Sequence, residues 1–269
     1  MTARDDKPLV DVQGLEVHFG SVANPVRAAD GVSFQIFSGE IVALVGESGS
    51  GKSISALALA NLVPEPAGRI VGGSVNFQDL DVLTLNKSEL RKLRGARIAY
   101  IFQEPATSLN PVYTVGWQIG EAIRLHRKGV KVKAEVEKLL TDVGLPDPAR
   151  TARSYPHELS GGMQQRAMIA MALACNPDLL VADEPTTALD VTVQKQILEL
   201  LVGLREKRGL SILLITHNLG IVANVADRVY VMNNGKIVES GETKTVLRTP
   251  QHEYTQKLLK AVPRLHKTV

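Results

Sequence analysis

The chain has 269 residues, 44% hydrophobic and 22% charged, which is ordinary for a soluble globular protein and excludes a disordered or fibrous one. Its formal net charge of +3 is small and its basic residues are dispersed, so no nucleic-acid partner is expected. No apolar run reaches the roughly 20 residues of a membrane-spanning helix, no export signal is visible, and one cysteine excludes an intrachain disulfide.

The first part of the chain alternates short strands with turns. Alternating apolar residues predict strands over 9–19 and 32–37. The run over 41–45 is apolar at every position, which predicts a strand covered on both faces. A helix is expected over 54–62, ended by the prolines that follow it.

Between the apolar strand and this helix lies a glycine-rich loop with the pattern G-x-x-x-x-G-K-S. Its residues are Gly46, Glu47, Ser48, Gly49, Ser50, Gly51, Lys52 and Ser53. The glycines let backbone N–H groups converge on phosphate oxygens, and the helix adds the positive end of its dipole. Lys52 is predicted to reach the β- and γ-phosphates, and the Ser53 hydroxyl to ligate Mg²⁺. The chain is therefore predicted to bind a nucleoside triphosphate.

The middle of the chain is predicted to be mainly helical. Amphipathic patterns predict helices over 115–126 and 132–143, between two strand-rich stretches. Because these helices have apolar faces to bury, residues 104–153 are interpreted as an inserted helical subdomain. The elements expected just before it are strands over 74–77, after a pair of glycines, and 97–102, and a charged helix over 87–94.

The remaining sequence returns to an alternation of helices and strands. The expected elements are helices over 161–175, from Asp190 to Gly209 and over 243–262, strands over 179–182 and 210–216, and a hairpin formed by 228–232 and 236–239. Apolar strands alternating with helices predict an α/β fold.

Two carboxylates follow one of the apolar strands. Asp183 ends the strand that begins at residue 179, at the sheet edge where the phosphate loop is also expected, and is predicted to hold Mg²⁺. Glu184 is then the candidate general base that polarises the attacking water. An Asp-Glu pair is more commonly part of a solvated loop, but buried-type residues before it and Pro185 after it favour a functional role.

Gln103 and His217 also follow strands. His217 is placed to donate a hydrogen bond to the γ-phosphate, although a histidine in this position is more often structural. Gln103 is placed to sense the γ-phosphate or the metal while its backbone hinges the helical insert; taken alone, it is a surface residue.

A second anion site is predicted at the start of the helix after residue 160. Ser160 is a good N-cap, and Gly161 and Gly162 leave the N–H groups of the first turn uncovered. A capped helix without a ligand explains the same residues. A triphosphate needs only one phosphate loop, so a second anion site calls for a further explanation.

These motifs together resemble the ATP-binding cassette (ABC) family. The order and spacing of the phosphate loop, Gln103, the string LSGGMQQR at 159–166, Asp183-Glu184-Pro185, Ala188-Leu189-Asp190 and His217 are similar to that family over nearly the whole chain. The resemblance implies an ABC-type P-loop NTPase fold: a mixed-sheet core, an antiparallel β subdomain and an inserted α-helical subdomain. It implies an ATPase core over 1–103 and 154–245, the insert over 104–153 and a C-terminal helical extension over 246–269.

The family resemblance also implies how the second anion site acts. Two cassettes, identical or paralogous, are expected to form a head-to-tail dimer with two ATP molecules, in which each phosphate loop faces Ser160–Gly162 of the partner. Asp190 is expected at this interface, and Phe19 matches the position that stacks on adenine, although a core phenylalanine explains it almost as well. Mg²⁺ is expected on Ser53, Gln103 and Asp183.

Within the family the chain looks most like ATPase subunits of bacterial peptide and nickel importers, on the residues of 102–111, 155–158, 251–255 and 261–264. The resemblance implies two separate permease subunits that contact the insert, an indirect link to a solute-binding protein, and a peripheral location at the cytoplasmic face of the membrane. Many such subunits carry a cysteine-bearing tail with an iron–sulfur cluster, which the single Cys175 does not support. A soluble ABC-type ATPase acting on nucleic acid or ribosomes is the alternative.

Overall fold

The computed structural model of the protein describes residues 7–187 and 189–261, so the predictions for Ala188 and for 262–269 lie outside the described residues. The described chain forms two compact units. The first contains the residues up to 85 and those from 213 onward, and the second contains 86–212. The division into core, insert and extension expected from the sequence stays a prediction.

The first unit contains two sheets. The antiparallel sheet has the strand order β2-β1-β4-β5, with β1 (Val10–Phe19), β2 (Val26–Ile36), β4 (Gly68–Phe77) and β5 (Leu80–Asp81). The part of the mixed sheet in this unit has the order β10-β9-β3-β8, with β3 (Ile41–Val45), β8 (Ser211–Thr216, whose first two residues are assigned to the second unit), β9 (Arg228–Asn233) and β10 (Lys236–Glu242). Strand β3 runs parallel to β9, and β9 and β10 form the hairpin predicted from the sequence.

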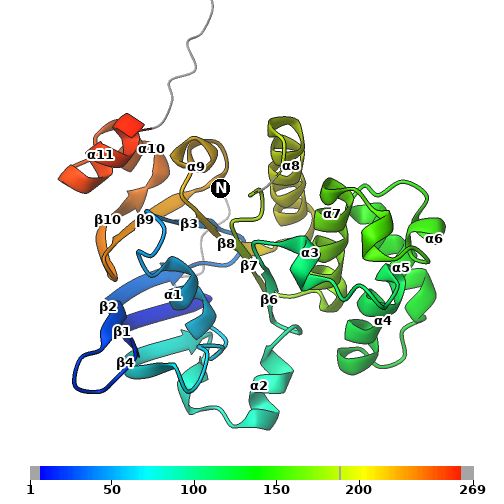
Figure 1. The fold of residues 1–269 in the computed structure, drawn as a ribbon, viewed down its shortest axis with the longest axis horizontal. Coiled ribbons are helices and arrows are strands. Elements are labelled where there is room, and N and C mark those ends of the chain that lie inside the picture. Colours follow the sequence, from blue (N-terminus) through cyan, green and yellow to red (C-terminus); the bar gives the residue numbers. More distant parts are fainter. Residues whose placement is uncertain (1–6, 188, 262–269) are drawn as a thin grey trace, which may run out of the picture. The chain divides into compact units, whose positions relative to one another are not determined.

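Helices α9 (Leu219–Val225), α10 (Thr243–Arg248) and α11 (Glu253–Ala261) cover the mixed sheet of the first unit, and α1 (Lys52–Ala58) packs against β1 and β2. Helices α9, α10 and α11 gather beside β9 and β10 (Figure 1). Their apolar residues pack on Val45 of β3 and on Val229 and Val231 of β9. All five residues of β3 are buried, as the apolar run predicted, and β3 leads directly into the glycine-rich loop.

The glycine pair at 72–73 was expected to precede a strand, but it lies inside β4. Here β4 pairs with β1 through an irregular register between Gln13 and Glu16. A Cβ on Gly73 would lie 2.5 Å from the carbonyl oxygen of Gly14, and the Gly73 φ of +87° is left-handed. The glycines therefore allow a bulge between two strands instead of ending one.

The second unit joins a parallel strand pair to a group of helices. The strands are β6 (Ile98–Ile101) and β7 (Leu179–Asp183). The helices are α2 (Lys87–Leu93), α3 (Pro105–Ser108), α4 (Val115–His126), α5 (Val132–Asp142), α6 (Pro148–Thr151), α7 (Gly161–Ala172) and α8 (Val191–Arg208). Helices α4 to α7 gather into one cluster, and α4 and α5 have the positions predicted from the amphipathic pattern (Figure 1).

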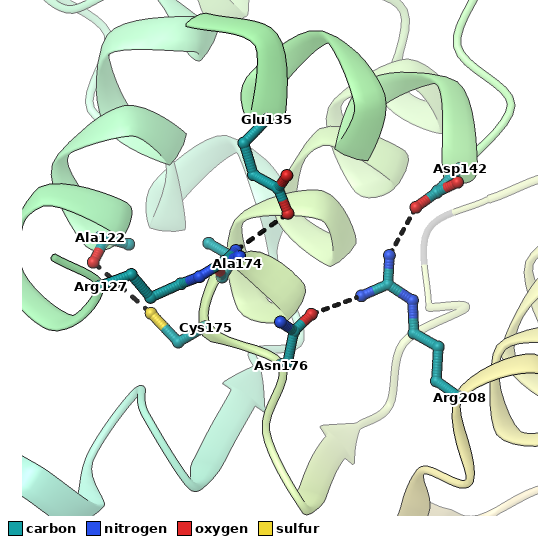
Figure 2. A network of polar contacts seen from close by, with 8 residues as sticks. All are labelled: Ala122, Arg127, Glu135, Asp142, Ala174, Cys175, Asn176 and Arg208. Atoms are coloured by element: carbon teal, nitrogen blue, oxygen red, sulfur yellow. Dashed lines mark hydrogen bonds and ion pairs between the residues drawn. The ribbon is translucent and has the colours of Figure 1, made fainter. Parts of the chain in front are cut away.

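Two arginines connect α5 to its neighbours, one following α4 and the other at the end of α8 (Figure 2). Arg127 Nη1, just after α4, lies 2.9 Å from Glu135 Oε1 on α5 and donates to the Ala174 carbonyl oxygen, also at 2.9 Å. Arg208 Nη2, at the end of α8, donates to Asp142 Oδ2 at 2.5 Å. The first pair is largely buried, with 22% and 16% of the Arg127 and Glu135 side chains exposed.

The Arg127–Glu135 pair makes stability depend on pH. The hydrogen bond from Arg127 holds the pKa of Glu135 below its ordinary range, so this stabilisation is full above the unfolded pKa and is lost as pH falls through the folded one. We expect Glu135→Gln to lower the free energy of unfolding by about 1–2 kcal/mol at pH 7, and the deficit to shrink below about pH 4. Urea unfolding at several pH values measures the difference in the free energy of unfolding between the wild type and the variant. Glu137→Gln on the same helix is the control. A deficit that is constant with pH would contradict the ion-pair explanation.

Candidate active site

The glycines of the phosphate loop allow close contacts with backbone from other strands of the first unit. A Cβ on Gly46 would lie 2.1 Å from the carbonyl oxygen of Met232, and a Cβ on Gly51 would lie 2.0 Å from that of Ala28. Gly49 has open space around it but a left-handed φ of +80°. Glycine is thus required at 46 and 51 because a side chain would clash with neighbouring backbone, and at 49 because the backbone is left-handed.

Lys52 is the first residue of α1, and only 5% of it is exposed. Its Nζ donates to the carbonyl oxygens of Gly46 at 2.9 Å and Glu47 at 2.7 Å, and lies 3.4 Å from Ser50 Oγ. The loop therefore curls around its own ammonium group. Ser53, one residue further along α1, is exposed. A phosphate group entering this concavity would meet a cation that is already in position.

The second unit brings Gln103 and Glu184 together across 81 positions of sequence. Glu184 follows β7, which ends at the half-buried Asp183, and has a left-handed φ of +46°. Glu184 Oε2 accepts a hydrogen bond from Thr187 Oγ1 at 2.8 Å and one from Gln103 Nε2 at 3.4 Å. A non-glycine residue in this conformation is costly, and such residues concentrate at functional sites.

Thr187 is a residue that sequence reasoning missed. Its hydroxyl contacts the Glu184 carboxylate, and its backbone N–H donates to the Glu184 carbonyl oxygen at 3.1 Å. The two contacts form a local turn that holds the carboxyl group in one orientation. A hydroxyl residue three positions after a carboxylate was the signal that could have identified it.

The same unit brings the starts of helices α7 and α8 together. Ser160 Oγ accepts from the Met163 N–H at 3.4 Å, and Asp190 Oδ1 accepts from the Val193 N–H at 3.0 Å. Both residues cap their helices, as predicted from the sequence. A Cβ on Gly162 would lie 2.9 Å from Val193 Cγ1, so the glycine allows this close packing. Ser160 and Asp190 are both exposed, which leaves two adjacent helix starts open to a ligand or a partner.

Side chains within 159–166 hold this segment in place. Gln164 Nε2 donates to the carbonyl oxygens of Pro156 at 2.9 Å and Leu159 at 3.1 Å, which fixes the chain before α7. Arg166 Nη1 donates to the Val143 carbonyl oxygen at 2.6 Å, which joins α7 to the end of α5. These positioning contacts were not assigned from the sequence.

The two remaining predicted site residues belong to the first unit. His217 is exposed and directly follows β8, as expected. Phe19 ends β1 and is half-buried, and a Cβ on Gly68 would lie 2.7 Å from its Cζ atom. The absence of a side chain at Gly68 leaves room for the Phe19 ring. The roles of both residues stay predictions.

Two family models match the chain. Residues 29–187 match the model described as "ABC transporter", and residues 238–268 match "Oligopeptide/dipeptide transporter, C-terminal region". The chain therefore belongs to the ABC transporter family. It is an ATPase of that family, with the α/β cassette fold predicted from the sequence.

The chain is also similar to individual proteins. It is 53% identical over 257 residues to the dipeptide transport ATP-binding protein DppD of Haemophilus influenzae, covering 95% of this chain and 78% of that protein. It is 51% identical to DppD of Escherichia coli K12, with the same coverage. The predicted ATPase subunit of an ABC importer is thereby confirmed over the alternative of an ATPase acting on nucleic acid or ribosomes.

The fold is similar to that of a solved cassette. This relative is the ATP-binding cassette MJ0796, solved as a dimer in a post-hydrolysis state bound to ADP and Pi. It matches with a TM-score of 0.77 and 27% identity, covering 87% of this chain and 98% of that one. The part of the chain that the structure describes contains no helix long and apolar enough to cross a membrane.

The contact at Gly51 leads to a prediction. Gly51→Ala would place a methyl group against the Ala28 carbonyl oxygen at a backbone φ of +102°, so the loop has to shift. We expect ADP affinity to fall at least about tenfold, the equivalent of about 1.4 kcal/mol, which calorimetric titration measures. Gly209→Ala is the control, because Gly209 has a φ of +64° but nothing within 4 Å. Equal ADP affinity in both variants would contradict the proposed importance of this contact.

Proposed function

We propose that this chain powers the import of dipeptides or other short peptides, as one of two ATPase subunits that act on separate permease subunits. The identity of 53% and 51% to two dipeptide transport proteins, over 95% of the chain, is the observation that carries the proposal. The match of residues 238–268 to an oligopeptide/dipeptide transporter region supports peptides over nickel as cargo.

In the proposed mechanism two cassettes, identical or paralogous, close head to tail on two ATP molecules. Ser160–Gly162 of each cassette would contact the γ-phosphate held by the phosphate loop of the other, and Asp190 would lie at the interface. The exposed start of α7 supports this arrangement, because a helix N-terminus with a neutral cap attracts anions. The dimeric state of the solved relative MJ0796 supports it as well.

Within each site Lys52 would bind the β- and γ-phosphates, exchanging its bonds to the Gly46 and Glu47 carbonyl oxygens for phosphate oxygens. The rest of the loop, Glu47, Ser48, Gly49, Ser50, Gly51 and Ser53, would surround the phosphates. The backbone N–H groups that follow Glu47 and the Ser53 hydroxyl would face the phosphate oxygens, while the Glu47 N–H keeps its bond to the Tyr254 hydroxyl. Phe19 would stack on adenine, and His217 would donate to the γ-phosphate.

Ser53, Gln103 and Asp183 would hold Mg²⁺. Their hydroxyl, amide and carboxylate oxygens are the donors that Mg²⁺ prefers. The described residues contain no cluster of three or more His, Cys, Asp or Glu side chains that could hold a metal. The set of Ser53, Gln103 and Asp183 contains one carboxylate. It fits Mg²⁺, because this ion usually takes few protein ligands and completes its shell with water and phosphate oxygens. When bound, Mg²⁺ neutralises charge on the β- and γ-phosphates.

Glu184 would orient the attacking water and accept its proton. The bonds from Thr187 and Gln103 to Oε2 support this role, because they hold the carboxyl group in one orientation before water arrives. Gln103 would also link the site to the insert, since it lies between β6 and the helices that follow.

The helical insert would contact the permease subunits at the cytoplasmic face of the membrane. Large apolar side chains are exposed on the insert and just before it: Val112 is 69% exposed, Trp117 40%, and Phe102, which precedes the insert, 46%. The Tyr113 and Trp117 rings stack at a centroid distance of 4.0 Å. The adjoining, exposed Tyr113 and Trp117 rings support a partner contact here, because adjoining exposed apolar side chains are typical of a surface that a partner protein covers.

Replacing the proposed general base separates binding from turnover. We expect Glu184→Gln to lower kcat for ATP at least about 100-fold, while ATP binding persists and an ATP-bound dimer accumulates in size-exclusion chromatography. In proteoliposomes containing the permease subunits, the wild-type chain should drive uptake of labelled dipeptide but not of Ni²⁺, and the variant should drive neither. Wild-type turnover in the variant would remove Glu184 from the mechanism, and uptake of Ni²⁺ alone would refute the peptide assignment.

Action across the dimer is tested by mixing two inactive variants. Ser160→Leu blocks the second anion site and Lys52→Ala disables the phosphate loop, so each variant alone should lack ATPase activity. A mixed dimer contains one site that combines the intact loop of one chain with the intact Ser160 segment of the other. We therefore expect the mixture to hydrolyse ATP well above either variant alone. No recovery, with mixed dimers shown by differential tagging, would mean that each chain uses its own Ser160 segment.

A further inference from the structure

A tyrosine from the C-terminal segment reaches the phosphate loop. The hydroxyl oxygen of Tyr254, on α11, accepts a hydrogen bond from the backbone N–H of Glu47 at 3.0 Å, across 207 positions of sequence. Only 9% of Tyr254 is exposed, and its ring belongs to the apolar cluster that contains Val45 of β3 and Val231 of β9. The ring is thus anchored in the core while the hydroxyl ends at the loop.

The position of this hydroxyl is set by strand β10. Glu239 Oε1 accepts from the Gln251 N–H at 2.8 Å, and Glu239 Oε2 accepts from the His252 N–H at 3.1 Å. The Tyr254 N–H in turn donates to His252 Nδ1 at 3.1 Å. One carboxylate therefore fixes the chain just before α11, and Tyr254 follows within two residues.

The Glu47 residue that Tyr254 contacts is also the one that orients Lys52. The Glu47 N–H donates to the Tyr254 hydroxyl, and the Glu47 carbonyl oxygen accepts from Lys52 Nζ at 2.7 Å. Residue 47 is therefore held from both sides, by the C-terminal segment and by the predicted phosphate-binding cation. Burial raises the pKa of Tyr254, so the group at the loop is a neutral hydroxyl near neutral pH.

We propose that Tyr254 is a positioning residue for the phosphate loop, through which the segment 238–261 sets the nucleotide affinity of the cassette. The proposal rests on nucleotide binding by this loop. Tyr254 contacts no substrate; it restricts Glu47 and thereby keeps the loop backbone beside Lys52 in the conformation that phosphate binding requires. Because coupling between two sites is reciprocal, nucleotide binding also stabilises the docking of α11.

Two matched variants test the proposal in the full chain. Tyr254→Phe removes only the hydroxyl that contacts Glu47. Tyr230→Phe is the control: Tyr230 is also buried, and its hydroxyl accepts from a backbone N–H at 3.1 Å, but that N–H belongs to Gln35 of β2. The Tyr230 hydroxyl also contacts Arg228 and the Gln35 carbonyl oxygen, so Tyr230→Phe removes at least as many contacts within the same unit as Tyr254→Phe does. A general loss of stability would therefore affect the control at least as much.

We expect Tyr254→Phe to weaken MgADP binding about 3- to 10-fold, the range that corresponds to one hydrogen bond, while Tyr230→Phe leaves it unchanged in calorimetric titration. Amide exchange of Glu47 should be faster in Tyr254→Phe than in the wild type or in Tyr230→Phe, with or without nucleotide. MgADP should slow amide exchange of α11 in the wild type more than in Tyr254→Phe.

Equal MgADP affinity in Tyr254→Phe and the wild type would overturn the proposal, as would an unchanged exchange rate at Glu47. If the wild-type chain binds no MgADP, nucleotide binding by the loop is refuted instead, and the exchange rate at Glu47 still tests the Tyr254 contact by itself. If Tyr254→Phe does not fold, Glu239→Gln gives the test. It weakens the anchor of α11, so it should raise both the Kd for MgADP and the exchange rate at Glu47, and no change in either would overturn the proposal.

Discussion

The proposed nucleotide site depends on the hydrogen bonds of the buried Lys52 ammonium group. The loop closes around this cation through the Gly46 and Glu47 carbonyl oxygens, at 2.9 and 2.7 Å. In the closed loop, Gly46 lies against the backbone of Met232 and Gly51 against the backbone of Ala28. Both contacts are so close that a side chain at either glycine would clash. The phosphate loop is therefore a property of the whole first unit, because β2 and β9 shape it as much as its own glycines do.

The second unit meets a comparable constraint at the end of β7. Glu184 leaves the strand in a left-handed conformation, which costs on the order of 1–3 kcal/mol for a non-glycine residue, and its carboxylate is held by Thr187 and Gln103. Each of these contacts restricts a side chain that is proposed to act in hydrolysis. In both units, the polar side chains that are proposed to act in hydrolysis are oriented by neighbouring residues before any ligand binds.

The C-terminal segment belongs to this organisation. The region that matches the oligopeptide/dipeptide transporter model contains Glu239 and Tyr254, and it connects the hairpin strand β10 to the phosphate loop. The region that matches this transporter model is therefore in direct contact with the predicted phosphate loop. This contact offers a physical route by which events at the C-terminal segment alter nucleotide binding.

The sequence by itself determined the features that depend on neighbouring residues. The apolar strand before the phosphate loop, the helix caps at Ser160 and Asp190, and the turn between β9 and β10 follow from local patterns, and the structure contains them. Only the tertiary structure decided which distant residues meet. Gln103 reaches Glu184 across 81 positions and Tyr254 reaches Glu47 across 207. The glycine pair at 72–73 allows a bulge inside β4 because β1 lies against it. Such contacts depend on packing between elements far apart in the chain, which hydrophobic periodicity and turn composition do not encode.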